Sequence, residues 1–287
     1  MEATRPRRSW LFVPGADESA QAAAARSGAD VLIQELEDFT PPELRPQARI
    51  LAVDLYEKWR KAGAIAAVRV NPLETCGRED LLAVLQGRPD IVLMPKVVSA
   101  EQVRALEQAT GGAFELVPNV ETAAGLLNAF QIAKASRKVT AMLVASEDMV
   151  ADLGTSRSRT GAELAYVRAR FLVECRAASV EAIDCPYTFS DVAGAVRDAK
   201  YAKQLGYRMK SLVATEHAKA INTVFSVNAS ELKNAQRLVH AFEKARKEGK
   251  GRAKVDGKLV EVPIYSAAKR LIASAAHTQP PPRKKPR

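Results

Sequence analysis

Short apolar segments alternate with helical segments through the first 225 residues of this 287-residue chain. Each apolar segment is strand-sized, and successive segments are separated by about 25 to 30 residues, as in repeated β-α units. Strict alternation of this kind favours a parallel sheet, and eight units fit a (β/α)8 TIM barrel, an α/β fold. The predicted strands cover residues 9–14, 31–38, 64–71, 91–96, 114–121, 139–147, 180–184 and 209–214.

The segments between the predicted strands carry helix signals. Ser99, followed by Gln102 three positions later, is typical of a capping box at a helix N-terminus. A doubly wound open sheet is the alternative arrangement, but no G-x-G-x-x-G motif follows the first strand, which disfavours a dinucleotide-binding version. We expect helices over residues 17–26, 41–61, 78–86, 99–110, 122–135, 162–178 and 191–205, and one more that ends near residue 225.

The alternation stops after residue 225, which predicts a TIM-barrel catalytic domain over residues 1–225. The next part, residues 226–278, reads as a helix over 231–247, a hairpin that turns at Asp256 and Gly257, and a helix over 264–275. A segment of this size is too small for a strong core of its own, so we expect it to pack on a barrel as a C-terminal lid. The remaining residues, 279–287, are predicted to form a disordered basic tail.

Composition excludes several classes of protein. The chain is 47% hydrophobic and 26% charged, which is ordinary for a globular protein, and its apolar runs are too short to cross a membrane. The formal charge of +10 is scattered along helices apart from the tail, so we expect an anionic small molecule rather than nucleic acid as partner. Three cysteines without metal-site spacing, and no signal-peptide segment, predict free thiols and a cytoplasmic location.

Charged side chains gather where the predicted strands end. In a barrel these ends meet at the C-terminal rim, where active sites lie. Two of the acids, Glu121 and Asp148, follow what we expect to be neighbouring strands, about 4.8 Å apart, and could share one Mg²⁺. The alternatives are a solvated strand end for Glu121 and a helix cap for Asp148. The full set is Glu37, Asp38, Arg69, Lys96, Glu121, Glu147 and Asp148.

The other rim residues suggest a substrate clamp. Arg69 is a forked donor suited to a substrate carboxylate, although an ion pair with Glu37 across adjacent strand ends explains it equally well. Lys96 is a second candidate for substrate binding. Glu37 and Asp38 could hold metal-bound waters, or else cap the helix that starts at Pro41.

Several of these motifs together resemble the HpcH/HpaI aldolase family, and within it the citrate lyase β-subunit-like branch that includes malyl-CoA and citramalyl-CoA lyases. The resemblance implies a (β/α)8 barrel with a C-terminal lid, usually trimeric, and a Mg²⁺-dependent carbon–carbon lyase. It implies Mg²⁺ ligation by Glu121 and Asp148, a substrate clamp at Arg69, and support from Glu37 and Asp38. The matching stretches are SWLFVPG, ELEDFTPPELRPQAR, VRVNPLET, VLMPKVVSAEQV, VPNVETAAGLLN, ASEDMVADLG, RARFLVECRAASVEAID and GKLVEVP.

The chain departs from the family pattern at three places. Glu35 stands where the family usually has aspartate, and Ala214 and Thr215 replace a His-Pro pair in a loop that borders the thioester end of the substrate. In the lid, Glu261 aligns with an aspartate that reaches a neighbouring subunit's site, so the resemblance implies proton transfer by Glu261.

We therefore expect a homo-oligomer, a trimer or hexamer, that uses Mg²⁺ to cleave a 3-hydroxy-acyl-CoA or a related 3-hydroxy acid into a 2-keto acid and an acyl product. The alternatives are a CoA-independent aldolase, a thioesterase of the same family, and a catalytically silent homologue that acts as a binding subunit.

Overall fold

The computed structural model describes residues 5–278 of the chain. They form two compact units, Arg7–Phe225 and a second unit that contains the described residues from Ser226 onward. The predicted basic tail, residues 279–287, lies outside the described residues. Within residues 5–278, none of the helices combines the length and the apolar character that crossing a membrane requires.

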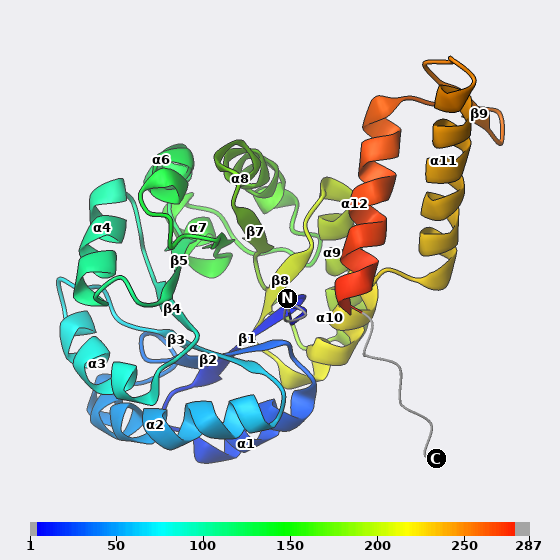
Figure 1. Cartoon of the computed structure of the whole chain (residues 1–287). Helices are drawn as coiled ribbons and strands as arrows, with labels where there is room; N and C mark the ends of the chain where they lie inside the picture. Colours follow the sequence, from blue (N-terminus) through cyan, green and yellow to red (C-terminus); the bar gives the residue numbers. More distant parts are fainter. Residues whose placement is uncertain (1–4, 279–287) are drawn as a thin grey trace, which may run out of the picture. The chain divides into compact units, whose positions relative to one another are not determined.

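Eight parallel strands close into a barrel in the first unit (Figure 1). Each strand pairs with the next one in the sequence, and β8 returns to β1 through pairs such as Leu11 with Leu212. The predicted (β/α)8 fold is therefore confirmed. The strands are β1 (Ser9–Pro14), β2 (Val31–Glu35), β3 (Ile65–Arg69), β4 (Ile91–Met94), β5 (Glu115–Val120), β6 (Ala141–Val144), β7 (Glu181–Asp184) and β8 (Met209–Leu212).

Helices follow the strands and surround the barrel (Figure 1). The capping box predicted at Ser99 and Gln102 is present, with each side chain bonded to the backbone of the other residue. The α-helices are α1 (Glu18–Ser27), α2 (Arg45–Lys61), α3 (Gly77–Val84), α4 (Ala100–Ala109), α5 (Ala123–Leu127), α6 (Ala129–Lys134), α7 (Glu147–Asp152), α8 (Ala165–Ala178), α9 (Val192–Leu205) and α10 (Ala218–Phe225). Short 3-10 turns are η1 (Pro42–Leu44), η2 (Leu85–Gly87), η3 (Ala162–Leu164) and η4 (Thr215–His217).

Alternation along the strands separates two apolar cores. On β2, Ile33 belongs to the core that fills the barrel lumen, whereas Leu32 belongs to the core between the strands and the helices. Both faces of a parallel strand are therefore buried, which explains why these strands read as nearly continuous apolar runs. The lumen core contains Trp10, Phe12, Val31, Ile33, Ile65, Ala67, Ile91, Leu93, Val117, Ala141, Leu143, Ile183 and Met209.

Most of the predicted strands are too long at their C-terminal ends. The strand predicted over residues 31–38 ends at Glu35, so Glu37 and Asp38 lie in the following loop. The helix predicted over residues 122–135 is also wrong in part, because it breaks at Asn128 between α5 and α6. The side chain of Asn128 donates a hydrogen bond to the Val98 carbonyl, a contact that neighbours in sequence cannot predict.

The second unit contains α11 (Ala229–Lys247), the strands β9 (Ala253–Val255) and β10 (Lys258–Val260), and α12 (Val262–Thr278). The hairpin turns at Asp256 and Gly257, as predicted, and both residues have positive φ. Its small core includes the rings of Phe242 and Tyr265, whose centroids are 4.7 Å apart. A lid role for this unit stays a prediction.

Candidate active site

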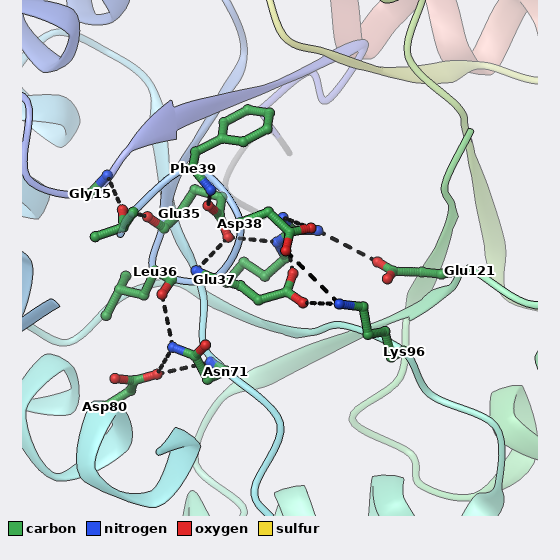
Figure 2. Close-up of polar contacts among 12 residues, drawn as sticks. Gly15, Glu35, Leu36, Glu37, Asp38, Phe39, Asn71, Asp80, Lys96 and Glu121 are labelled. Atoms are coloured by element: carbon green, nitrogen blue, oxygen red, sulfur yellow. Dashed lines mark hydrogen bonds and ion pairs between the residues drawn. The ribbon is translucent and has the colours of Figure 1, made fainter. Parts of the chain in front are cut away.

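Arg69 stands at the centre of a buried charge cluster at the C-terminal end of β3. Figure 2 labels the acids Glu35, Glu37, Asp38 and Glu121 of this cluster. The Nε atom of Arg69 lies 2.9 Å from Glu35 Oε1, and its Nη2 atom lies 3.2 Å from Glu37 Oε2. Its Nη1 atom lies 3.5 Å from Glu121 Oε1, and its guanidinium group lies 4.8 Å from the ring centroid of Phe12. The pairing with Glu37 that the sequence allowed is therefore present, together with two others.

Glu35 holds the loop that follows β2. Its carboxylate accepts backbone N–H bonds from Glu37 at 2.7 Å and from Phe39 at 2.5 Å. Thr40 joins this loop to the end of β1, because its hydroxyl donates to the Glu35 carbonyl and accepts from the Gly15 N–H at 2.9 Å. A Cβ at Gly15 would lie 2.6 Å from the Glu35 carbonyl oxygen, so this close approach requires glycine.

Asn71 supports the same loop from the end of β3. Its amide Nδ2 donates to the Leu36 carbonyl at 2.8 Å and to Asp80 Oδ2 at 2.8 Å (Figure 2). Arg49 in turn pairs with Asp80 at 2.8 Å. Leu36 is thus held by Asn71, which Asp80 of α3 holds in turn. Such support holds functional side chains in one geometry.

Lys96 reaches the cluster from the loop after β4. Its Nζ donates to Glu37 Oε1 at 2.6 Å and lies 3.9 Å from Asp38 Oδ1. The backbone of Lys96 is left-handed, with φ of 54°. Non-glycine residues rarely adopt this conformation, and it often marks functional sites. Lys96 and Asp38 are both partly exposed and therefore form the open side of the cluster.

Glu121 and Asp148 follow adjacent strands, as predicted. Glu121 comes directly after β5, Asp148 lies in the first turn of α7 after β6, and the two strands pair through Val120 and Val144. Glu121 is fully buried, and its Oε2 atom has no hydrogen-bond partner within residues 5–278. Asp148 is half-buried, and its charge acts on the pKa of Glu121, which places the two carboxylates in one electrostatic environment.

Burial and charge shift the acid–base behaviour of the cluster. Burial raises the pKa of Glu121 to about 8, against the lowering effect of Arg69, and Asp148 adds to the rise. Burial also raises the pKa of Glu37, which Arg69 and Lys96 oppose. The hydrogen bond that Lys96 donates to the Glu37 carboxylate raises the pKa of Lys96. For Arg69, burial alone would lower the pKa, but the surrounding carboxylates raise it.

The cluster has more acids than bases. Glu35, Glu37, Asp38 and Glu121 surround Arg69, Asp148 adds a fifth carboxylate, and Lys96 is the second cation. A divalent cation between Glu121 and Asp148 would balance this excess and give the free Glu121 Oε2 atom a partner. Mg²⁺ typically binds one or two carboxylates and keeps several waters or substrate oxygens. Within the described part of the chain, no group of three or more His, Cys, Asp or Glu side chains is arranged to hold a metal ion.

The structure brings together most, but not all, of the predicted site residues. Arg69, Glu37, Asp38, Lys96 and Glu121 form one connected cluster, and the charge of Asp148 acts on the pKa of Glu121. Glu147 instead pairs with Arg157 at 3.2 Å and accepts a bond from Thr188. Glu261 is an exposed residue of the second unit, and its role in proton transfer stays a prediction.

Two buried residues of the site were not predicted. Glu35 was noticed only as a departure from the family pattern, yet it is fully buried and bonds Arg69. Asn119, two residues before Glu121, is also fully buried. The available signal was alternation, since Glu35 shares a strand face with Ile33, and Asn119 shares one with Val117.

A cavity of about 290 Å³ lies between β1, α1 and the segment after β8. Its lining includes Phe12 and Pro14 of β1, Ala20 of α1, and the Ala214–Thr215 pair that departs from the family pattern. One of its lining residues, Phe12, also contacts the guanidinium group of Arg69.

Comparisons with known proteins show related sequences. The sequence model described as HpcH/HpaI aldolase/citrate lyase matches residues 8–215. The citrate lyase subunit beta of Escherichia coli (strain K12) is 33% identical over 285 residues, which cover 95% of this chain and 94% of the relative. A (3S)-malyl-CoA thioesterase of Cereibacter sphaeroides is 34% identical over 285 residues, which cover 94% of this chain and 95% of the relative.

The fold has a match among solved structures. The crystal structure of CitE from Mycobacterium tuberculosis in complex with magnesium, acetoacetate and coenzyme A superposes with a TM-score of 0.78 at 27% identity. The match covers 94% of this chain and 98% of that one. The barrel, the acidic rim and these matches together place the chain in the HpcH/HpaI aldolase/citrate lyase family.

Proposed function

We propose that this protein is a Mg²⁺-dependent carbon–carbon lyase that cleaves a 3-hydroxy-acyl-CoA, or a related 3-hydroxy acid, into a 2-keto acid and an acyl product. The observation that carries the proposal is the buried Glu121, whose free Oε2 atom lies in a cluster with an excess of carboxylates. Asp148 on the adjacent strand end would be the second metal ligand. Crystals of related CitE contain magnesium with acetoacetate, and with oxaloacetate, which supports both metal and substrate class.

The proposed metal changes what an acidic site can bind. Mg²⁺, when bound, would act as a Lewis acid that stabilises developing negative charge on a substrate oxygen. Without Mg²⁺, the acids of the cluster outnumber its two cations, Arg69 and Lys96, and would repel a keto-acid anion. Arg69 would keep Glu121, Glu35 and Glu37 in fixed positions, and Lys96 on the open side would attract the substrate carboxylate.

Arg69 was predicted as the clamp for the substrate carboxylate. Its three nitrogen atoms each face a carboxylate of the protein, so a clamp at Arg69 would have to compete with Glu121 or Glu37. A metal bound by Glu121 would relieve this competition, because it takes over the charge that Arg69 balances. We therefore assign Arg69 to positioning Glu121 as well as to substrate binding.

A thioesterase is the second candidate, because one relative at 34% identity is a (3S)-malyl-CoA thioesterase. Both reactions would use a CoA thioester, and a cavity lies beside Ala214 and Thr215, with Phe12 of β1 in its lining. The products separate the two reactions. A lyase yields a 2-keto acid and an acyl-CoA, whereas a thioesterase yields free CoA and an intact hydroxy acid.

Calorimetric titration with Mg²⁺, with and without oxaloacetate or glyoxylate, tests the proposal before any substrate is known. We expect Mg²⁺ to bind and to increase keto-acid affinity, and Glu121→Ala and Asp148→Ala to abolish both effects while the circular dichroism spectrum is unchanged. Glu147→Gln is the matched control, because Glu147 is the acid next to Asp148 and pairs with Arg157 instead. Absence of both metal and keto-acid binding in the wild type would favour a catalytically silent binding subunit.

A further inference from the structure

Asn119 is a buried amide on β5, two residues after Val117 of the apolar lumen core. It has no exposed surface, and neither Nδ2 nor Oδ1 has a hydrogen-bond partner within the described residues. The amide offers two donors and two acceptor positions. Since buried polar groups in proteins are nearly always hydrogen-bonded, an unpaired one points to a function.

Asn119 faces the lumen, directly below the proposed metal site. Val117, two residues earlier on β5, belongs to the lumen core, so alternation places Asn119 and then Glu121 on the same face. Along the strand, Asn119 is one pleat deeper than Glu121.

The barrel register gives the height of Asn119 relative to Arg69. Arg69 pairs with Leu93 of β4, and Leu93 pairs with Val117 of β5. In an eight-stranded barrel of this type each step to the next strand also shifts the level by about one residue. The residue of β5 that is level with Arg69 is therefore Asn119. Alternate strands contribute the side chains of one layer, so Asn119 and Arg69 belong to the same layer at the floor of the site.

The charged donors near this floor already have partners. The nitrogen atoms of Arg69 face Glu35, Glu37 and Glu121 at 2.9, 3.2 and 3.5 Å, and Lys96 Nζ lies 2.6 Å from Glu37. Asn119, in contrast, is an uncharged donor and acceptor that no described residue occupies. An amide of this kind suits a ligand hydroxyl or carboxylate oxygen.

We propose that Asn119 determines specificity by hydrogen-bonding an oxygen-bearing substituent, a hydroxyl or a second carboxyl group, on the keto-acid part of the substrate. The site then discriminates against keto acids that carry hydrogen or an alkyl group at that position, because these leave the buried amide unpaired. This inference rests on the proposed function, since it assumes a keto acid bound above the floor.

The test compares two keto acids of nearly equal size, hydroxypyruvate and 2-oxobutyrate, by calorimetry in the presence of Mg²⁺. We expect the wild type to bind hydroxypyruvate at least tenfold more tightly, and Asn119→Leu and Asn119→Ala each to reduce this ratio to about one while Mg²⁺ affinity is kept. Val117→Leu, a packing change one pleat deeper, is the control and should keep the ratio.

Thermal denaturation separates recognition from a structural role. Asn119→Leu removes the unpaired amide and should melt at or above the wild-type temperature. A lower melting temperature with an unchanged ligand ratio would overturn the inference, because it would show that Asn119 serves the fold, for instance through a buried water. If the wild type binds hydroxypyruvate and 2-oxobutyrate equally tightly, the proposed role of Asn119 is refuted while the proposed function stands. No keto-acid binding in the wild type at all would refute the proposed function as well.

Discussion

Glu121 should make the metal-free protein less stable as pH rises. Burial raises its pKa from 4.5 to about 8, so the folded state retains the proton over a range in which the unfolded chain has lost it. Stability from this group is fully present below pH 4.5 and is lost as pH rises through 8. Each pKa unit corresponds to about 1.4 kcal/mol, so the shift corresponds to a loss of at most roughly 5 kcal/mol.

Glu121→Gln isolates this contribution, because glutamine has nearly the same shape and does not titrate. Other groups titrate in both proteins and cancel in the difference between them. We expect the free energy of unfolding of the variant, minus that of the wild type, to rise by about 1.4 kcal/mol per pH unit between pH 5 and 8, and to level off above 8. Urea denaturation in EDTA at half-unit steps of pH measures this difference.

Mg²⁺ should reverse the loss of stability with rising pH, and it should do so in the wild type but not in Glu121→Gln. Metal ligands must be deprotonated, so Mg²⁺ affinity should increase about tenfold per pH unit up to pH 8. The metal then stabilises the wild type most where burial of charged Glu121 is most costly. Glu147→Gln, whose side chain lies outside the cluster, should behave as the wild type does. Parallel stability curves for the wild type and Glu121→Gln would refute the reasoning, because they would show that Glu121 is ionised in the metal-free protein.

Three further substitutions test the scaffold. Lys210→Met should cost about 3–5 kcal/mol in urea denaturation, because it leaves Asp184, 2.6 Å from Lys210 Nζ, with one buried cation fewer; a cost below about 1 kcal/mol would contradict the role of this ion pair. Gly15→Ala should lower stability by about 1–3 kcal/mol through the clash with the Glu35 carbonyl, and an unchanged melting temperature would show that the loop adjusts freely. Ser99→Ala should cost about 1 kcal/mol by removing the capping box of α4, whereas Ser99→Asp, which keeps an N-cap acceptor, should recover most of it.

Local sequence signals predicted the elements and the order of the strands. The strands on which Ile33 and Leu93 lie are buried on both faces, so they read as apolar runs whatever surrounds them. The capping box at Ser99 and the turn at Asp256 also depend on residues within a few positions of each other. Eight repeats of one unit then left few topologies other than the closed barrel.

Strand and helix ends depended on side-chain hydrogen bonds that the apolar pattern of the sequence does not show. The strand β2 ends at Glu35 because that carboxylate accepts the N–H groups of Glu37 and Phe39, which turns the chain away from the sheet. The break between α5 and α6 occurs where Asn128 bonds the Val98 carbonyl, 30 positions earlier. Neither contact has a local signature.

A second buried charge network is another feature that the local sequence does not predict. This buried network between the strands and the helices joins Arg168 of α8, Asp184 of β7, Asp198 of α9 and Lys210 of β8, with ion-pair distances of 2.5 to 2.7 Å. In the sequence each of them looks like an ordinary surface charge. Only the packing of two helices on two strands removes these four side chains from water and makes their pairing necessary.

The sequence alone determined which side chains arrive at the rim of the barrel, because alternation and strand order decide that. It named Glu121, Asp148, Arg69 and Lys96 as candidates for one site. Only the tertiary structure decided how they share charge, with Arg69 held among three carboxylates and one oxygen of Glu121 left without a partner. Distances between side chains on different strands depend on barrel closure, tilt and burial, and these are properties of the whole fold rather than of any segment.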